Sequence, residues 1–149
     1  MTPGESDLEA RVRRLEDLLE INQLFVDYGR YLDLGDFGSF ARLFAEDGEI
    51  LLGPVARARG RKEIQAAMEA SLSGHVGETK HIISSPAVTL DGDTATSVVM
   101  WTVLARTDAG AAVTLVGRHE DDLVREHGRW HIRRRRGFVE LPGSVMKGS

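Results

Sequence analysis

The chain has 149 residues, a length that suits one domain with a single hydrophobic core. Hydrophobic residues make up 42% and charged residues 28%, which is typical of globular proteins, and the net charge of −4 does not favour nucleic acid as a partner. The chain contains no cysteine, which excludes disulfides, iron–sulfur clusters, thiol catalysis and cysteine-based zinc sites. Without a run of membrane-spanning length or a signal-peptide pattern, the sequence predicts a cytoplasmic protein with no membrane contact.

The N-terminal part of the chain predicts one long amphipathic helix. The sequence Ser6-Asp7-Leu8-Glu9 has the form of a capping box that begins a helix, and Gly35 can end it in a left-handed conformation. Between these limits apolar residues recur every three or four positions, which predicts one buried stripe. Its members are Leu8, Val12, Leu15, Leu18, Ile21, Phe25, Tyr28 and Leu32.

The next segment predicts two shorter helices with a brief strand between them. Asp36 can cap a helix that runs through Ala45, with three phenylalanines facing inward: Phe37, Phe40 and Phe44. Residues 49–52 predict a short strand that ends at Gly53-Pro54. A third helix follows Gly60-Arg61, and its buried side is predicted to carry Ile64, Ala67, Met68 and Leu72. Residues 72–78 predict a loop.

From Thr79 onward the sequence predicts strands. Three turn sequences, at residues 91–93, 108–110 and 127–128, join long β-rich runs, which is the pattern of an antiparallel meander. Helices followed by such a meander predict an α+β fold with the helices packed on one face of a curved, mainly antiparallel sheet. We expect one domain over residues 1–149, with flexible ends at 1–6 and 141–149. A curved sheet closed by helices predicts a cone whose apolar interior binds a small molecule.

Several motifs resemble the SnoaL-like branch of the NTF2-like superfamily. They are Tyr28–Ile50, with its Leu-Phe-Ala-Glu-Asp-Gly sequence, then Lys80–Pro86, Asp91–Ala95, Gly117–Asp121 and Gly128–Ile132. In order and spacing they cover roughly residues 10 to 138. The resemblance implies a cone-shaped α+β roll, in agreement with the fold predicted from the pattern of helices and strands.

Within this branch, the resemblance points to a histidine–aspartate pair. The arrangement is similar to that of scytalone dehydratase, hexachlorocyclohexane dehydrochlorinase and the bile acid 7α-dehydratases, where a strand histidine acts as base and an aspartate at the end of the first helix orients it. These positions correspond to His81 and Asp33, and a tyrosine of the bile acid enzymes corresponds to Tyr28. In ketosteroid isomerases the base lies at the end of the first strand, where this chain has Leu52, so the resemblance favours dehydratase-like chemistry.

The chemistry of these three residue types fits such a site. Imidazole titrates near neutral pH, and a carboxylate at Asp33 would fix its tautomer and stabilise the imidazolium. The helix dipole disfavours a carboxylate at a helix C-terminus, so Asp33 invites a compensating partner. Tyr28 could donate a hydrogen bond to a substrate oxygen. The alternatives are a structural histidine, a solvent-facing aspartate and a core tyrosine.

Three further residues are candidates for substrate binding: Trp101, His119 and Arg135. All three lie on predicted strands, but strand alternation leaves their faces open, because one bulge reverses it. Core packing for Trp101, and surface or ion-pair roles for the other two, are the alternatives. No histidine spacing predicts a metal site, and no glycine-rich phosphate loop or serine-triad motif is present, so no metal or cofactor is expected.

The sequence therefore predicts a cofactor-independent lyase or isomerase, of dehydratase or cyclase type, acting on a small, largely apolar cyclic molecule. The alternative is a non-catalytic binding or assembly module of the NTF2-like type. An epoxide hydrolase of limonene type would need an Asp-Arg-Asp constellation that the sequence does not place. The resemblance also implies a homodimer or homotrimer formed through the open face of the sheet, where long strands need covering.

Overall fold

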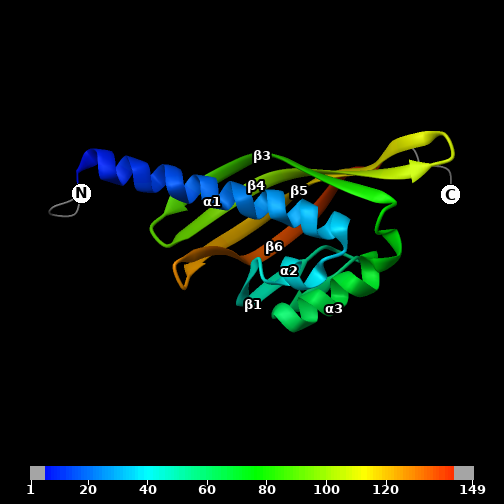
Figure 1. The fold of residues 1–149 in the computed structure, drawn as a ribbon, viewed down its shortest axis with the longest axis horizontal. Coiled ribbons are helices and arrows are strands. Elements are labelled where there is room, and N and C mark those ends of the chain that lie inside the picture. The colour runs from blue at the N-terminus through cyan, green and yellow to red at the C-terminus, as the bar shows by residue number, and fades with distance from the viewer. Residues whose placement is uncertain (1–5, 143–149) are drawn as a thin grey trace.

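The computed structural model describes residues 6–142, and Figure 1 shows three helices gathered on one side of a long, twisted sheet. Of the two ends predicted to be flexible, residues 1–5 and 143–149 lie outside the described residues. Within the described range, Ser6 caps the first helix and the last strand runs through Pro142.

The first helix, α1, spans Asp7–Leu34 and has the limits that the sequence predicted. The Ser6 side chain accepts a hydrogen bond from the backbone N–H of Glu9 (3.0 Å), which satisfies one of the free donors at a helix start. Gly35 follows the helix with φ of 73°, a left-handed conformation that glycine adopts at little cost.

The second helix, α2 (Phe37–Ala41), is shorter than predicted. Asp36 caps it by accepting from the backbone N–H of Ser39 (3.1 Å), but the helix ends four residues before Ala45. Phe44 and Ala45 instead begin strand β1 (Phe44–Leu51). The prediction was wrong here because Phe37, Phe40 and Phe44 keep a helical spacing across the helix–strand junction, and all three are buried.

Beyond β1 come the short strand β2 (Arg57–Arg59), helix α3 (Arg61–Leu72) and a single 3₁₀ turn η1 (Ser73–His75). Four long strands follow as a meander: β3 (Thr79–Asp91), β4 (Thr94–Thr107), β5 (Gly110–Glu126) and β6 (Arg129–Pro142). One six-stranded sheet has the order β2-β1-β6-β5-β4-β3, in which only the β1–β6 pair is parallel. The predicted α+β architecture with a mainly antiparallel sheet is thus confirmed.

The main core lies between the sheet and the C-terminal half of α1. Residues of this half are buried against β1, β4 and β6, among them Ile21, Phe25, Tyr28 and Leu32. The first half of the predicted stripe was wrong: Leu8, Val12 and Leu15 are exposed, because they lie on the side of α1 opposite the residues that pack on the sheet.

A polar network joins the middle of α1 to the turn region between β5 and β6. Arg125 forms a bidentate pair with Asp17, at 2.8 and 3.0 Å, and the indole N–H of Trp130 donates to the same carboxylate at 3.0 Å. The hydrogen bonds from Arg125 hold the pKa of Asp17 below its usual value, against the opposing effect of burial. This network sets the position of α1 along the sheet and therefore also places the helix end that carries Tyr28 and Asp33.

Candidate active site

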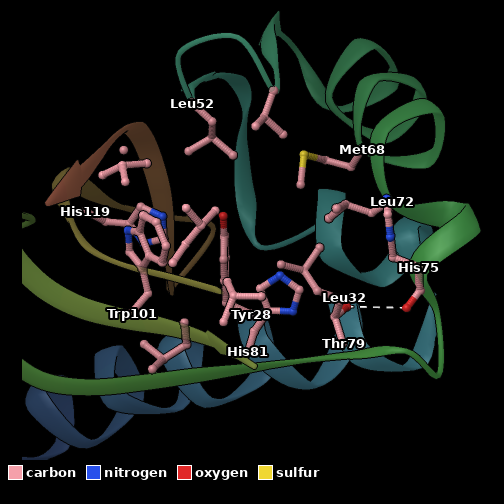
Figure 2. Close-up of a pocket in the computed structure, with 16 residues that line it drawn as sticks. Tyr28, Leu32, Leu52, Met68, Leu72, His75, Thr79, His81, Trp101 and His119 are labelled. Carbon is pink, nitrogen blue, oxygen red and sulfur yellow. Dashed lines mark hydrogen bonds between the residues drawn. The ribbon is translucent and has the colours of Figure 1, made fainter. Parts of the chain in front are cut away.

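A cavity of about 280 Å³ opens between the helices and the concave face of the sheet. Its wall is mostly apolar and draws on α1, α3 and the strands β3 to β6, as Figure 2 shows. Three histidines line it, His75, His81 and His119, together with Tyr28 and Trp101. A largely apolar space with a few polar groups is the usual form of a small-molecule site.

Asp33 and His81, 48 positions apart in the sequence, meet at the edge of this cavity. The Nδ1 atom of His81 lies 2.9 Å from Oδ1 of Asp33, and the backbone N–H of His81 donates to the same oxygen, also at 2.9 Å. Both side chains are shielded, with exposed fractions of 14% and 13%. The imidazole projects into the cavity (Figure 2), so its second nitrogen, Nε2, is the one available to a ligand.

The close approach of α1 to β3 depends on Gly29. A Cβ atom at this position would lie 3.0 Å from the carbonyl oxygen of His81 and 3.2 Å from a side-chain carbon of Ile83. Glycine therefore lets the strand pass close enough for Asp33, one turn later on the same helix, to reach His81. The sequence signal was available, since a glycine inside a helix carries a cost that packing or function must offset.

Tyr28 lies one turn and a half before Asp33 and is buried, with 2% of its surface exposed. Its ring packs against Phe40 (4.7 Å between centroids) and edge-on against His119 (5.4 Å), and its phenol oxygen points into the cavity (Figure 2). Burial raises the pKa of Tyr28, which the nearby Arg135 guanidinium opposes. The phenol therefore stays protonated at neutral pH and can donate a hydrogen bond.

Arg135 has the ion-pair role that was the alternative to substrate binding. It is fully buried in a bidentate ion pair with Asp121 (2.6 and 2.8 Å), and Ser97 donates to the same carboxylate at 3.0 Å. Its guanidinium carbon lies 4.2 Å from the centroid of the Tyr28 ring, and Arg135 is not among the described residues that line the cavity. Arg135 therefore packs against the ring of Tyr28 and does not line the cavity in which a substrate would bind.

Trp101 and His119 both line the cavity, as adjacent rings on neighbouring strands (5.7 Å between centroids). Two strand glycines make room for them. A Cβ at Gly117, the register partner of Trp101, would lie 2.5 Å from the indole ring, and one at Gly137 would lie 3.3 Å from His119. Gly117 and Gly137 were missed as site residues, although glycine inside a strand often marks such a close approach.

His119 is held in its neutral form. Burial lowers its pKa well below the usual value of 6.5, and the nearby Arg135 and His81 act in the same direction. The unfolded chain binds a proton at this position below about pH 6.5, whereas the folded chain does not. The free energy of unfolding should therefore fall as the pH drops below that value, by up to about 1.4 kcal/mol per pH unit.

This prediction is checked with His119→Gln. Urea unfolding of the wild type and the variant between pH 7.5 and 5.0 should give two curves that differ in slope, with the variant less sensitive to acid. Parallel curves would show that His119 titrates equally in the folded and unfolded states.

Three buried polar atoms have no hydrogen-bond partner among residues 6–142: Nε1 of Trp101, Nδ1 of His119 and Nη1 of Arg135. Trp101 and His119 line the cavity, but their unpaired nitrogen atoms are themselves buried. Within the same described range, no cluster of three or more His, Asp or Glu side chains could hold a metal ion, and no helix is long and apolar enough to span a membrane.

Known proteins resemble this chain in sequence and in fold. An uncharacterized protein of Mycobacterium tuberculosis is 30% identical over 126 residues, which cover 83% of this chain and 86% of that protein. An NTF2-like protein with a cystatin-like fold from Novosphingobium aromaticivorans has a TM-score of 0.85 at 26% identity, over 97% of this chain and 96% of its own.

A candidate scytalone dehydratase from the same bacterium has a TM-score of 0.72 at 22% identity, over 86% of this chain and 87% of its own, and shows the fold alone. The model of the SnoaL-like domain matches residues 13–136, which include the end of α1, His81, strands β3 to β5 and the first part of β6. The chain therefore belongs to the SnoaL-like domain family, a branch with the NTF2-like fold.

Proposed function

We propose that the protein is a cofactor-independent lyase or isomerase in which His81 removes a proton from a carbon acid. The observation that carries this proposal is the 2.9 Å contact between Nδ1 of His81 and the Asp33 carboxylate, at the wall of a cavity into which the imidazole projects. A general base must lie within reach of a substrate proton and must keep its lone pair available.

The geometry selects the reactive tautomer. A carboxylate only accepts hydrogen bonds, so the short contact requires the proton of the neutral imidazole to be on Nδ1. The lone pair is then on Nε2, the nitrogen that faces the cavity. Because Oδ1 of Asp33 also accepts from the backbone N–H of His81, ring and strand are held together, and the imidazolium formed by proton uptake is stabilised.

The reaction step follows from this arrangement. Nε2 of His81 takes the proton, and the electron pair of the broken C–H bond forms a C=C bond to the adjacent carbonyl carbon. The π pair of the carbonyl moves to its oxygen, which holds the charge as an enolate. When the carbonyl re-forms, the C=C pair either expels a leaving group from the next carbon, with His81 returning the proton to that group, or takes the proton back at another carbon. Elimination and double-bond shift are thus two outcomes of one step.

The cavity also limits the substrate. A volume of about 280 Å³ suits a molecule of one or two rings, and the wall offers mostly carbon atoms. The Tyr28 phenol oxygen points into the cavity, and the rings of His119 and Trp101 line the wall beside it. A cyclic ketone or related carbonyl compound, with its oxygen on the Tyr28 side, matches this distribution.

The alternative of a non-catalytic binding or assembly module predicts that Asp33 and His81 are not hydrogen-bonded, or that side chains fill the cone. The short contact and the open cavity favour the catalytic proposal over it.

The test is deuterium exchange at carbon. The purified protein is incubated with 2-tetralone in D₂O, and loss of the α-proton signals is followed by NMR against a matched buffer blank. We expect exchange faster than the blank, with a rate that saturates as ketone concentration rises. Exchange at the blank rate for 2-tetralone and for a series of smaller cyclic ketones would refute proton abstraction from this class.

A further inference from the structure

Helix α1 carries a second apolar stripe on its outer side. Its members are Leu8, Val12, Leu15, Leu19 and Val26, with exposed fractions of 66%, 43%, 60%, 69% and 50%. Their spacing alternates between four and three residues, and the one position that breaks the apolar pattern is Asn22. This is the seven-residue repeat in which the first and fourth positions form the seam of a coiled coil.

The outer stripe lies almost opposite the buried stripe of the same helix. At about 100° per residue, its members cluster on one side, and the residues packed on the sheet cluster on the other. The buried set is Asp17, Ile21, Leu24, Phe25, Tyr28 and Leu32. The outer stripe therefore contributes nothing to the described core. Single exposed apolar residues are ordinary, but five aligned on one helix face form a continuous surface that favours association.

The helix is accessible for such a contact. In Figure 1 the N-terminal part of α1 (blue) projects past the ends of the strands, while α2 and α3 lie toward its other end. An isolated helix shorter than about 12–15 residues is marginally stable in water, but here the C-terminal half of α1 is already held by the sheet. Association through the exposed part would therefore cost little further ordering.

We propose that the outer stripe pairs with the same stripe of a second copy of this chain, as a short parallel two-stranded coiled coil. With Val12, Leu19 and Val26 at the first position of the repeat, Leu8 and Leu15 fall at the fourth. Two of the three first-position residues, Val12 and Val26, are β-branched, and β-branched residues there with leucine at the fourth position favour two parallel strands. The stripe is self-complementary, which suits a two-fold symmetric contact.

The charges beside the stripe argue for the parallel orientation. Glu9, Glu16 and Gln23 follow one edge of the seam, and Arg11 lies on the other edge. In a parallel pair, opposite edges face each other, which brings Arg11 of each copy to the partner's Glu16. In an antiparallel pair, like edges meet, and the glutamates of the two copies would repel each other. Arg11 and Glu16 are both exposed and available for this contact.

This contact is independent of the proposed function. It uses the outer side of α1, whereas Tyr28 lines the cavity and Asp33 contacts His81 from the last two turns of the helix. It also differs from the association predicted through the open face of the sheet, where Val98 and Met100 are partly exposed apolar residues.

The orientation is tested by cross-linking, which the absence of cysteine makes clean. Leu8→Cys places one thiol per chain at the seam, and only a parallel pair brings the two thiols within the distance that a disulfide requires. The matched control is Ala10→Cys, which is also exposed but lies on the other side of the same helix. Mild oxidation should give a covalent dimer of the first variant and leave the second monomeric. Equal cross-linking of both variants would refute the parallel seam.

The contact itself is tested by sedimentation velocity over a range of protein concentrations. We expect the wild type to form a dimer and Glu16→Arg to dissociate it at least ten-fold more readily, because Arg11 then faces a like charge. The double variant Arg11→Glu with Glu16→Arg should restore the dimer. Met100→Glu, on the sheet, should leave it intact. A monomeric wild type, or a dimer broken by Met100→Glu and not by Glu16→Arg, would overturn the proposal.

Discussion

Substitution of His81 by alanine is expected to lower the rate of α-proton exchange by about 10²–10⁴-fold, the usual contribution of a positioned general base. The variant loses the Nε2 lone pair and leaves the Asp33 carboxylate bonded to the backbone N–H of residue 81 alone. Since His81 is only partly buried, its removal should change the stability of the fold little. The measurement is the exchange rate of 2-tetralone, with thermal unfolding recorded on the same preparations.

A second histidine provides the matched control. His75 also lines the cavity but is exposed, and its backbone carbonyl accepts hydrogen bonds from the N–H of Glu78 (2.9 Å) and the hydroxyl of Thr79 (3.3 Å; Figure 2). His75→Gln should therefore keep nearly the wild-type rate. Asp33→Asn should be slow, because an amide can no longer fix the tautomer or stabilise the imidazolium. Exchange by His81→Ala at the wild-type rate would rule out His81 as the base.

Replacement of Asp121 by leucine should lower the free energy of unfolding by about 3–5 kcal/mol, because Arg135 then keeps its charge in a fully buried site without a counter-ion. Burial by itself lowers the pKa of Arg135, but the Asp121 carboxylate outweighs this, so the guanidinium is charged in the native protein. Urea unfolding monitored by tryptophan fluorescence gives the comparison.

The double variant Asp121→Leu with Arg135→Met should recover most of the lost stability, since it removes both charges and keeps apolar volume under Tyr28. The control is Asp122→Leu. Asp122 is the next residue on β5, points to the exposed face and pairs in register with Arg134, so its loss should cost less than about 1 kcal/mol. Equal losses of stability for the two single variants would show that the buried ion pair contributes no more to the free energy of unfolding than the exposed one.

The sequence predicted the local elements well where one residue decides a boundary. Ser6 and Gly35 define the ends of α1 through chemistry that acts within a few residues. Which side of the helix is buried depends instead on how α1 packs on the sheet, and a spacing of three or four residues does not show this. For this reason Leu8 and Leu15 were assigned to a single buried stripe, although the helix carries two stripes on opposite sides.

The site was harder to predict because its members are distant in sequence. The contact between Asp33 and His81 was expected from the family resemblance, and neither residue has a local pattern that names the other. The same limit applies to Arg135, whose partner Asp121 lies on the adjacent strand at a register that bulges in β5 and β6 could have shifted. Nothing in the local sequence told which face of the strand would hold the pair.

A single oxygen of Asp33 bonds both the backbone N–H and the ring of His81, so the pair exists only while α1 is packed against β3. Oδ1 of Asp33 belongs to α1 and both of its donors belong to β3, with Gly29 setting the spacing between the two elements. When the end of α1 detaches transiently, His81 therefore loses its contact with Asp33 even though the sheet remains intact. The free energy of this local opening, which amide hydrogen exchange at His81 would report, limits how much of the folded population is competent at any moment.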